Sequence, residues 1–181
     1  NFLLKNLINL SRVFINSKTI LIFRNPIDTA LSAWDHNHHL YNKEKKIEHL
    51  NIMKSNGELN INKYVLHFCE TWNKQVKNLF EKIKIMPEKF LVITYEDLSV
   101  NKYDVLKKMF NHIGCKNDEE IISQIIENTS LEKMRITSSN PEFFNKGRVN
   151  FGKNDIDIST IKSAINSCKE GLSLTKIQTP Y

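Results

Sequence analysis

The sequence predicts an α/β fold in which a parallel sheet is flanked by helices in three layers. Two short apolar runs, at residues 19–23 and 90–94, have the composition of strands that are covered on both faces. Segments with helical spacing lie between and around them, and strands that alternate with long helices are typical of a parallel sheet. The length of 181 residues suits one domain with its own core.

The first strand is expected to lie between two helices. Residues 2–13 place apolar side chains at helical intervals. After the strand at 19–23, Pro26 presets the backbone of a first helical position, and Asp28 adds negative charge to the first turn. A helix from Pro26 to about residue 38 is therefore predicted.

The middle of the chain is expected to form a surface loop and then a long helix. Residues 40–60 are rich in Lys and Asn, and Asn56-Gly57 is a turn signal. Residues 61–84 are amphipathic. Their predicted inner face carries Val65, Phe68, Cys69, Trp72, Val76, Leu79 and Phe80.

Four shorter helices are predicted after the second strand. They span residues 102–113, ended by Gly114; residues 119–127, capped by Asp118; residues 131–134, capped by Thr129 or Ser130; and a last helix capped by Ser159, with Gly171 beyond its end. Residues 137–155 are expected to be irregular. No internal repeat occurs.

The composition argues against several classes of protein. Apolar residues make up 40% and charged residues 25% of the chain, as in a soluble globular protein, and no apolar run reaches membrane-spanning length. The net charge of +6 permits an acidic ligand. The basic residues form no stripe interleaved with aromatics, so nucleic acid is not the expected partner.

Neither the cysteines nor the histidines predict a metal site. The cysteines are single and widely spaced: Cys69, Cys115 and Cys168. Each is expected to be a buried, reduced thiol, which favours a reducing compartment. The clustered histidines lack a Cys or Glu at ligand spacing and are expected at a polar helix end: His36, His38 and His39.

Arg24 and Ser32 are the first candidate binding residues. Arg24 follows a strand and precedes a helix, and this junction binds anionic groups in many α/β folds. The planar guanidinium donates bidentate hydrogen bonds that suit phosphate. The local pattern leaves a second interpretation open, in which Arg24 pairs with a carboxylate and Ser32 has no binding role.

Four motifs in order along the chain resemble those of the PAPS-dependent sulfotransferases, where PAPS is 3′-phosphoadenylyl sulfate. They are Arg24-Asn25-Pro26 with Asp28 and Ser32; the strand 90–94 with Tyr95-Glu96-Asp97-Leu98; Asn128-Thr129-Ser130-Leu131-Glu132-Lys133-Met134; and Phe143-Phe144-Asn145-Lys146-Gly147-Arg148 with Lys153-Asn154. Together they span nearly the whole chain from about Thr19. The resemblance implies the C-terminal portion of a sulfotransferase fold, which is similar to that of P-loop NTPases.

The resemblance also implies roles for seven residues. Arg24 and Ser32 would bind the 3′-phosphate, and Tyr95 and Thr129 would frame the adenine. A basic loop would assist at the phosphate, through Lys146, Gly147 and Arg148. The family has Arg where this chain has Asn145, and Arg148 is expected to substitute for it. The Gly-Asp-Trp that follows in the family is replaced by Asn150, Phe151 and Gly152.

The activity that the resemblance implies is transfer of a sulfuryl group from PAPS to a hydroxyl or amine of a small-molecule or glycan acceptor, which leaves PAP as product. The family's phosphosulfate loop and catalytic His have no counterpart in these residues. Residues 1–181 are therefore expected to be one sulfotransferase domain without its N-terminal phosphosulfate-loop segment. The catalytic residues are unassigned, and the chain alone is expected to be inactive.

Two alternatives stay open beside a cytoplasmic enzyme. One is a Golgi-type carbohydrate or protein sulfotransferase, which an anchor upstream of this sequence would place in the Golgi lumen. The other is a non-catalytic relative that binds 3′-phosphoadenosine nucleotides without transferring a sulfuryl group. No metal is expected in any of the three.

Overall fold

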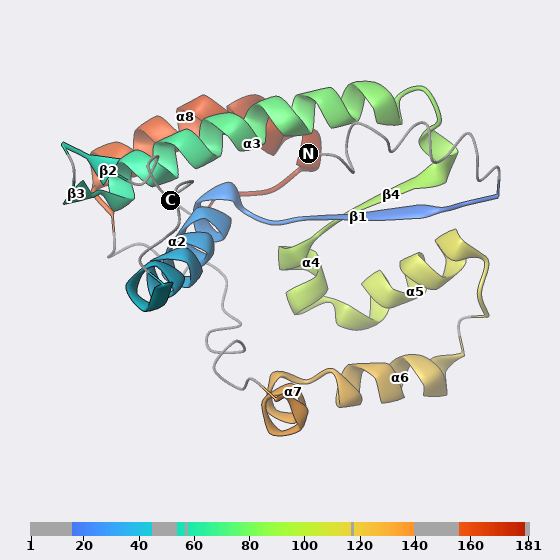
Figure 1. The fold of residues 1–181 in the computed structure, drawn as a ribbon. Helices are drawn as coiled ribbons and strands as arrows, with labels where there is room; N and C mark the ends of the chain where they lie inside the picture. Colours follow the sequence, from blue (N-terminus) through green and yellow to red (C-terminus); the bar gives the residue numbers. More distant parts are fainter. Residues whose placement is uncertain (1–15, 45–53, 57, 117, 140–155, 180–181) are drawn as a thin grey trace. The chain divides into compact units, whose positions relative to one another are not determined.

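The computed structural model of the protein describes residues 16–44, 54–56, 58–116, 118–139 and 156–179 (Figure 1). The helix expected at residues 2–13 lies outside them. The described elements fall into two compact units. One contains β1 (Thr19–Phe23), β4 (Phe90–Thr94), α4 (Tyr95–Val100), α5 (Lys102–Ile113), α6 (Glu119–Asn128) and α7 (Leu131–Thr137). The other contains α2 (Pro26–Glu44), β2 (Lys54–Ser55), β3 (Glu58–Leu59), α3 (Ile61–Ile83) and α8 (Ile158–Thr175).

The first unit is built on the parallel pairing of β1 with β4. Thr19 lies opposite Phe90 and Phe23 lies opposite Thr94, so the two strands end at the same level. The predicted strands and their parallel arrangement are confirmed. Because of this register, Arg24 and Tyr95 are each the first residue beyond a carboxyl end of the same strand pair.

Side-chain and backbone caps set the lengths of the helices in this unit. The Thr94 hydroxyl accepts a hydrogen bond from the Asp97 N–H at 3.0 Å and begins α4, a helix that the sequence had not indicated. Helix α5 ends at Gly114, as predicted, with φ of 76°. The N–H groups of Gly114 and Cys115 return to the carbonyls of Asn111 and Phe110, which is the Schellman arrangement that favours glycine.

The second unit is held together by α3 and α8, which run side by side in the same direction (Figure 1). Near their N-termini, Asn62 donates to the Asp157 carboxylate at 2.9 Å and accepts from the Asp157 N–H at 3.1 Å. Further along, the Asn73 side chain accepts from the Gly171 N–H at 2.7 Å. Exposed Lys77 and Glu170 form an ion pair.

Helix α2 packs on the same scaffold through aromatic side chains. The rings of Trp34 in α2 and Tyr64 in α3 lie 5.6 Å apart and tilted by 55°. Burial raises the pKa of the Tyr64 phenol, and a hydrogen bond with Asn37 of α2 opposes that shift. Ile27, Ala30 and Leu31 form the buried face of α2.

Two predicted helix ends differ from the structure. Helix α2 continues to Glu44 instead of ending near residue 38, since residues 39–44 contain neither Gly nor Pro to stop it. Its last turns replace part of the loop expected at 40–60, which also contains the β2–β3 hairpin. The predicted turn there is confirmed at Asn56, whose φ is 53°.

Helix α7 is longer than predicted. Ser130 caps it, and the helix ends at Thr137 and not at Met134.

The last helix also departs from its prediction. Ser159 was predicted to cap α8, but the residue that precedes the helix is Asp157. The Asp157 carboxylate does not cap the helix N–H groups and instead accepts a hydrogen bond from Asn62. Gly171 lies inside the helix, because a residue without a side chain is needed where α8 approaches Trp72. The helix ends at Thr175, and Lys176 follows as its cap residue with a left-handed φ of 59°.

The prediction of buried thiols holds for two of the three cysteines. Cys69 and Cys168 are buried, but Cys115 is exposed. Cys115 belongs to the turn that ends α5, where its backbone takes part in the cap and its side chain is left at the surface.

We expect Gly171→Ala to destabilise the full-length protein. A Cβ at this position would lie 2.6 Å from a ring carbon of Trp72. Overpacking of this kind costs about 1–3 kcal/mol, which exceeds the roughly 1 kcal/mol that alanine gains in a helix interior. Urea unfolding measures the change, with Ser163→Ala on the exposed side of α8 as the control. A stability equal to the wild type would contradict the close approach.

Candidate functional site

The start of α2 is fixed by the side chain of Asn25. Its Oδ1 accepts a hydrogen bond from the Ile27 N–H at 2.9 Å, and its backbone carbonyl accepts from the Thr29 N–H and hydroxyl at 2.9 and 2.8 Å. Asn25 is 1% exposed, and Ile27 and Asp28 are fully buried. The backbone around Arg24 is thereby attached to a rigid, buried helix start.

Arg24 and Ser32 stand at two positions of this one segment. Arg24 immediately precedes the cap residue and is half-buried, with its Nε atom buried. Ser32 lies within α2 and is exposed, on the side of the helix away from Ala30 and Leu31. A guanidinium at a helix start and a hydroxyl on the exposed face of that helix are groups that can bind an oxyanion.

Asp28 contributes the expected acidic residue in the first turn of α2. Its carboxyl is fully buried, where the N–H groups of the helix start favour negative charge. The sequence had indicated its place in the turn but not its burial. It also had not indicated that Asn25 is the cap, although Asn directly before a Pro at the first helical position is a recognisable signal.

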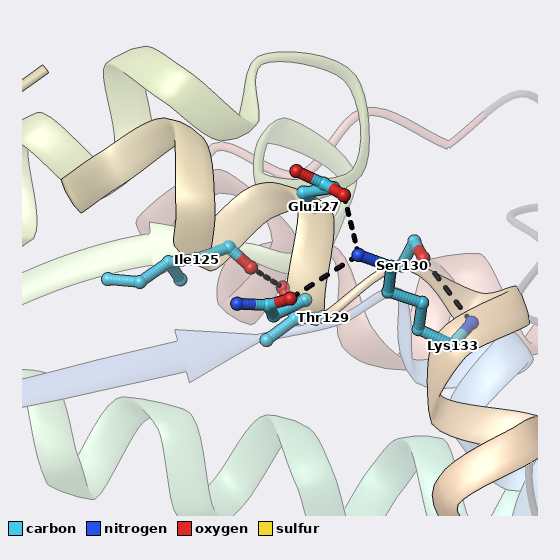
Figure 2. A network of polar contacts seen from close by, with 6 residues as sticks. Ile125, Glu127, Thr129, Ser130 and Lys133 are labelled. Carbon is cyan, nitrogen blue, oxygen red and sulfur yellow. Dashed lines mark hydrogen bonds and ion pairs between the residues drawn. The ribbon is translucent and has the colours of Figure 1, made fainter. Parts of the chain in front are cut away.

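Tyr95 and Thr129 belong to the other unit. Tyr95 is the first residue of α4, half-buried, and its carbonyl accepts from the Ser99 hydroxyl at 2.7 Å. Thr129 follows α6 and is exposed; its hydroxyl donates to the Ile125 carbonyl at 2.7 Å (Figure 2). Because that proton is engaged, the Thr129 hydroxyl is oriented to accept a hydrogen bond from a ligand.

A polar network fixes the segment that carries Thr129 (Figure 2). The Ser130 hydroxyl accepts from the Lys133 N–H at 3.4 Å and begins α7. The Lys133 ammonium binds the Glu127 carboxylate at 2.6 Å and the Asn128 side chain at 3.4 Å. Its hydrogen bond and its charge lower the pKa of Glu127. The network joins the end of α6 to the start of α7 and so restricts the backbone at Thr129.

The remaining candidate residues lie outside the described part of the chain: Lys146, Gly147 and Arg148. Their roles, like those of Arg24, Ser32, Tyr95 and Thr129, stay predictions. Among the residues that the structure describes, no group of three or more His, Cys, Asp or Glu side chains is placed to hold a metal ion. No helix in that part is both long and apolar enough to cross a membrane.

Comparison with known proteins identifies one family. A model of the sulfotransferase domain matches residues 5–176. A search of curated protein sequences found no match. A solved structure of the mouse sulfotransferase SULT7A1, complexed with PAP, is 20% identical with a TM-score of 0.58, and the alignment covers 89% of this chain and 62% of that one.

Two solved structures of retinol dehydratase are similar as well, each 22% identical to this chain and each covering 90% of it. One, with androsterone and the inactive cofactor PAP, has a TM-score of 0.63 and is covered over 49% of its length. The other, with retinol and PAP, has a TM-score of 0.62 and is covered over 50%. The chain thus spans about half to three-fifths of the solved proteins it resembles. The fold expected from the sequence motifs is confirmed.

We expect Asn25→Ala to destabilise the protein more than Asp118→Ala. Both residues are N-caps, but Asn25 serves the buried N–H of Ile27, whereas Asp118 serves the N–H of exposed Glu120 at 2.9 Å. Water can replace the lost acceptor only at the exposed cap. The buried loss should cost about 2 kcal/mol or more and the exposed loss about 1 kcal/mol or less, as measured by urea unfolding. Equal costs would show that burial of the cap adds nothing.

Proposed function

Because this chain belongs to the sulfotransferase domain family, we propose that it is part of an enzyme that transfers a sulfuryl group from PAPS to a hydroxyl or amine acceptor. The family match carries this proposal, and the PAP bound in the similar solved structures supports PAPS as the donor. The match spans elements of both compact units, which supports their belonging to one sulfotransferase domain.

In this proposal, Arg24 and Ser32 bind the 3′-phosphate of the nucleotide. A phosphate dianion gains most from a cation with fixed donors, and the buried start of α2 fixes the backbone next to Arg24. The exposed Ser32 hydroxyl would donate to a second phosphate oxygen. Lys146 and Arg148 would add positive charge, and Gly147 would allow the backbone to approach closely.

The adenine would be bound by Tyr95 and Thr129. The Thr129 hydroxyl already donates to the Ile125 carbonyl, so it would accept from the exocyclic amine of the purine. The half-buried ring of Tyr95 would supply an apolar face to the base. In this proposal these residues bind the donor, and the catalytic base stays unassigned because no His in this sequence matches the position of the family's catalytic His.

A small-molecule acceptor and a cytoplasmic setting complete the proposal. The solved relatives that bind androsterone or retinol support an acceptor of that size. The free cysteines support a reducing compartment. A second candidate is a non-catalytic protein that binds 3′-phosphoadenosine nucleotides, because all the matched motifs are ones that bind the nucleotide. Sulfuryl transfer by the full-length protein from PAPS to a phenol or alcohol distinguishes the enzyme from the binder.

We expect Arg24→Ala to weaken PAP binding by the full-length protein about 10- to 100-fold, the cost of a lost charge-assisted hydrogen bond. Ser32→Ala should weaken it about fivefold, because its donor is neutral. Neither change should alter binding of 5′-AMP, which lacks the 3′-phosphate. Calorimetric titration measures both ligands, with Ser163→Ala as the control. Equal losses of affinity for PAP and 5′-AMP would contradict the assignment of Arg24 and Ser32 to the 3′-phosphate.

We expect Thr129→Val to weaken PAP binding several-fold and Thr129→Ser to restore it, since serine keeps the acceptor oxygen. Inosine 3′,5′-bisphosphate has no exocyclic amine, so its affinity should not change. Thr137→Val is a matched control, because the exposed Thr137 also donates from its hydroxyl to a helical carbonyl, that of Lys133, at 2.9 Å. If Thr129→Val affects both purines alike, Thr129 does not recognise the amine.

A further inference from the structure

Two buried thiols that the proposed function does not use lie against each other between α3 and α8. Cys69 and Cys168 are both fully buried, and they come from segments 99 positions apart in the sequence. The Cys69 thiol is hydrogen-bonded to the sulfur of Cys168. The Cys168 thiol itself points to the Ile165 carbonyl, with Sγ 3.7 Å from the oxygen.

Contacts between α3 and α8 lie on both sides of this pair along the two helices. Asn62 with Asp157 lies before the thiols in both helices, and Asn73 with Gly171 lies after them. These flanking contacts prevent the helices from sliding past each other. At Gly171 the backbone of α8 comes within reach of the Trp72 ring, so the helices are closely packed beside the thiols.

Packed helices of ordinary spacing can accommodate a disulfide between facing residues. Helices whose axes lie about 8–10 Å apart, with Cα atoms about 2.3 Å from each axis, bring directly facing Cα atoms to roughly 3.5–5.5 Å. That range overlaps the separation of about 4.4–6.8 Å that a disulfide spans. We propose that Cys69 and Cys168 are a redox-sensitive pair, which a low-molecular-weight disulfide oxidises to an intramolecular disulfide that joins α3 to α8.

Thiol–disulfide exchange accounts for the atoms and electrons. The Cys168 thiolate attacks the small disulfide, forms a mixed disulfide and releases one thiolate. The Cys69 thiol then loses its proton, attacks the Cys168 sulfur and releases the second small thiol. Two protein thiols are oxidised, and one small disulfide is reduced to two thiols.

The order of the two attacks follows from the contact between the sulfurs. The hydrogen bond from Cys69 lowers the pKa of Cys168, while the same bond and burial raise the pKa of Cys69. Cys168 is therefore the first nucleophile. Because both sulfurs are buried, the small disulfide reaches them only when the helices separate locally, and oxidation is expected to be slow.

Oxidation should stabilise the protein against heat. A bond between residues 69 and 168 closes a long loop and so restricts the unfolded chain, while the folded helices keep their contacts. This inference goes beyond the proposed function and does not depend on it, since it concerns the scaffold of the second unit and involves none of the candidate nucleotide-binding residues.

The test uses the full-length protein with Cys115→Ser, which removes the exposed thiol that would react first. After incubation with oxidised glutathione, digestion without reductant should yield one peptide pair that joins residues 69 and 168. The unfolding temperature should rise by about 5 °C or more and return to its starting value with dithiothreitol. Sub-denaturing urea should speed the reaction, because it promotes local opening.

Two matched variants assign the effect to this pair. Adding Cys69→Ala or Cys168→Ala to the Cys115→Ser protein should abolish both the joined peptides and the rise in unfolding temperature. The peptide map of the Cys115→Ser protein decides the question even if these variants fold poorly. The proposal is overturned if both cysteines stay reduced after prolonged exposure in urea, if each carries glutathione instead, or if the joined peptides form without a gain in stability.

Discussion

The buried cap at Asn25 is the constraint on which the candidate phosphate site depends. One side chain and one carbonyl satisfy the Ile27 N–H, the Thr29 N–H and the Thr29 hydroxyl, all at the point where the chain leaves β1. An uncapped helix start in this buried position would leave polar groups without water or protein partners. With the cap in place, Arg24 and Ser32 belong to one continuous segment whose backbone cannot easily rearrange.

The two pairs of candidate residues use different physics. Arg24 and Ser32 offer a cation and a hydroxyl, the groups that suit a doubly charged phosphate. Tyr95 and Thr129 offer an aromatic ring and a single hydroxyl whose proton is already engaged, which suits a purine. A nucleotide with a 3′-phosphate needs both kinds of group. This division is the physical basis of the roles proposed for these four residues.

The second unit supplies a rigid scaffold for the candidate phosphate-binding residues Arg24 and Ser32. Helix α2 packs on α3 through Trp34 and Tyr64, and α3 is bound along its length to α8. The close approach at Gly171 is possible only without a side chain, so this glycine has a packing role and does not end the helix. The same close packing of α3 and α8 brings Cys69 against Cys168. The inferred redox chemistry therefore depends on this helix packing.

Local sequence determined most of the secondary structure and identified the family. Contacts between segments distant in the sequence determined the remaining helix ends and the burial of individual side chains. The strands at residues 19–23 and 90–94 and the helix ended by Gly114 could be predicted because apolar runs, caps and glycine act over a few residues. The four ordered motifs indicated the family, which the domain match confirms. The extension of α2, the place of Gly171 within α8, the exposure of Cys115 and the meeting of two thiols 99 positions apart could not be predicted. Each of these depends on the surface against which a segment packs, and only the folded chain brings that surface into place.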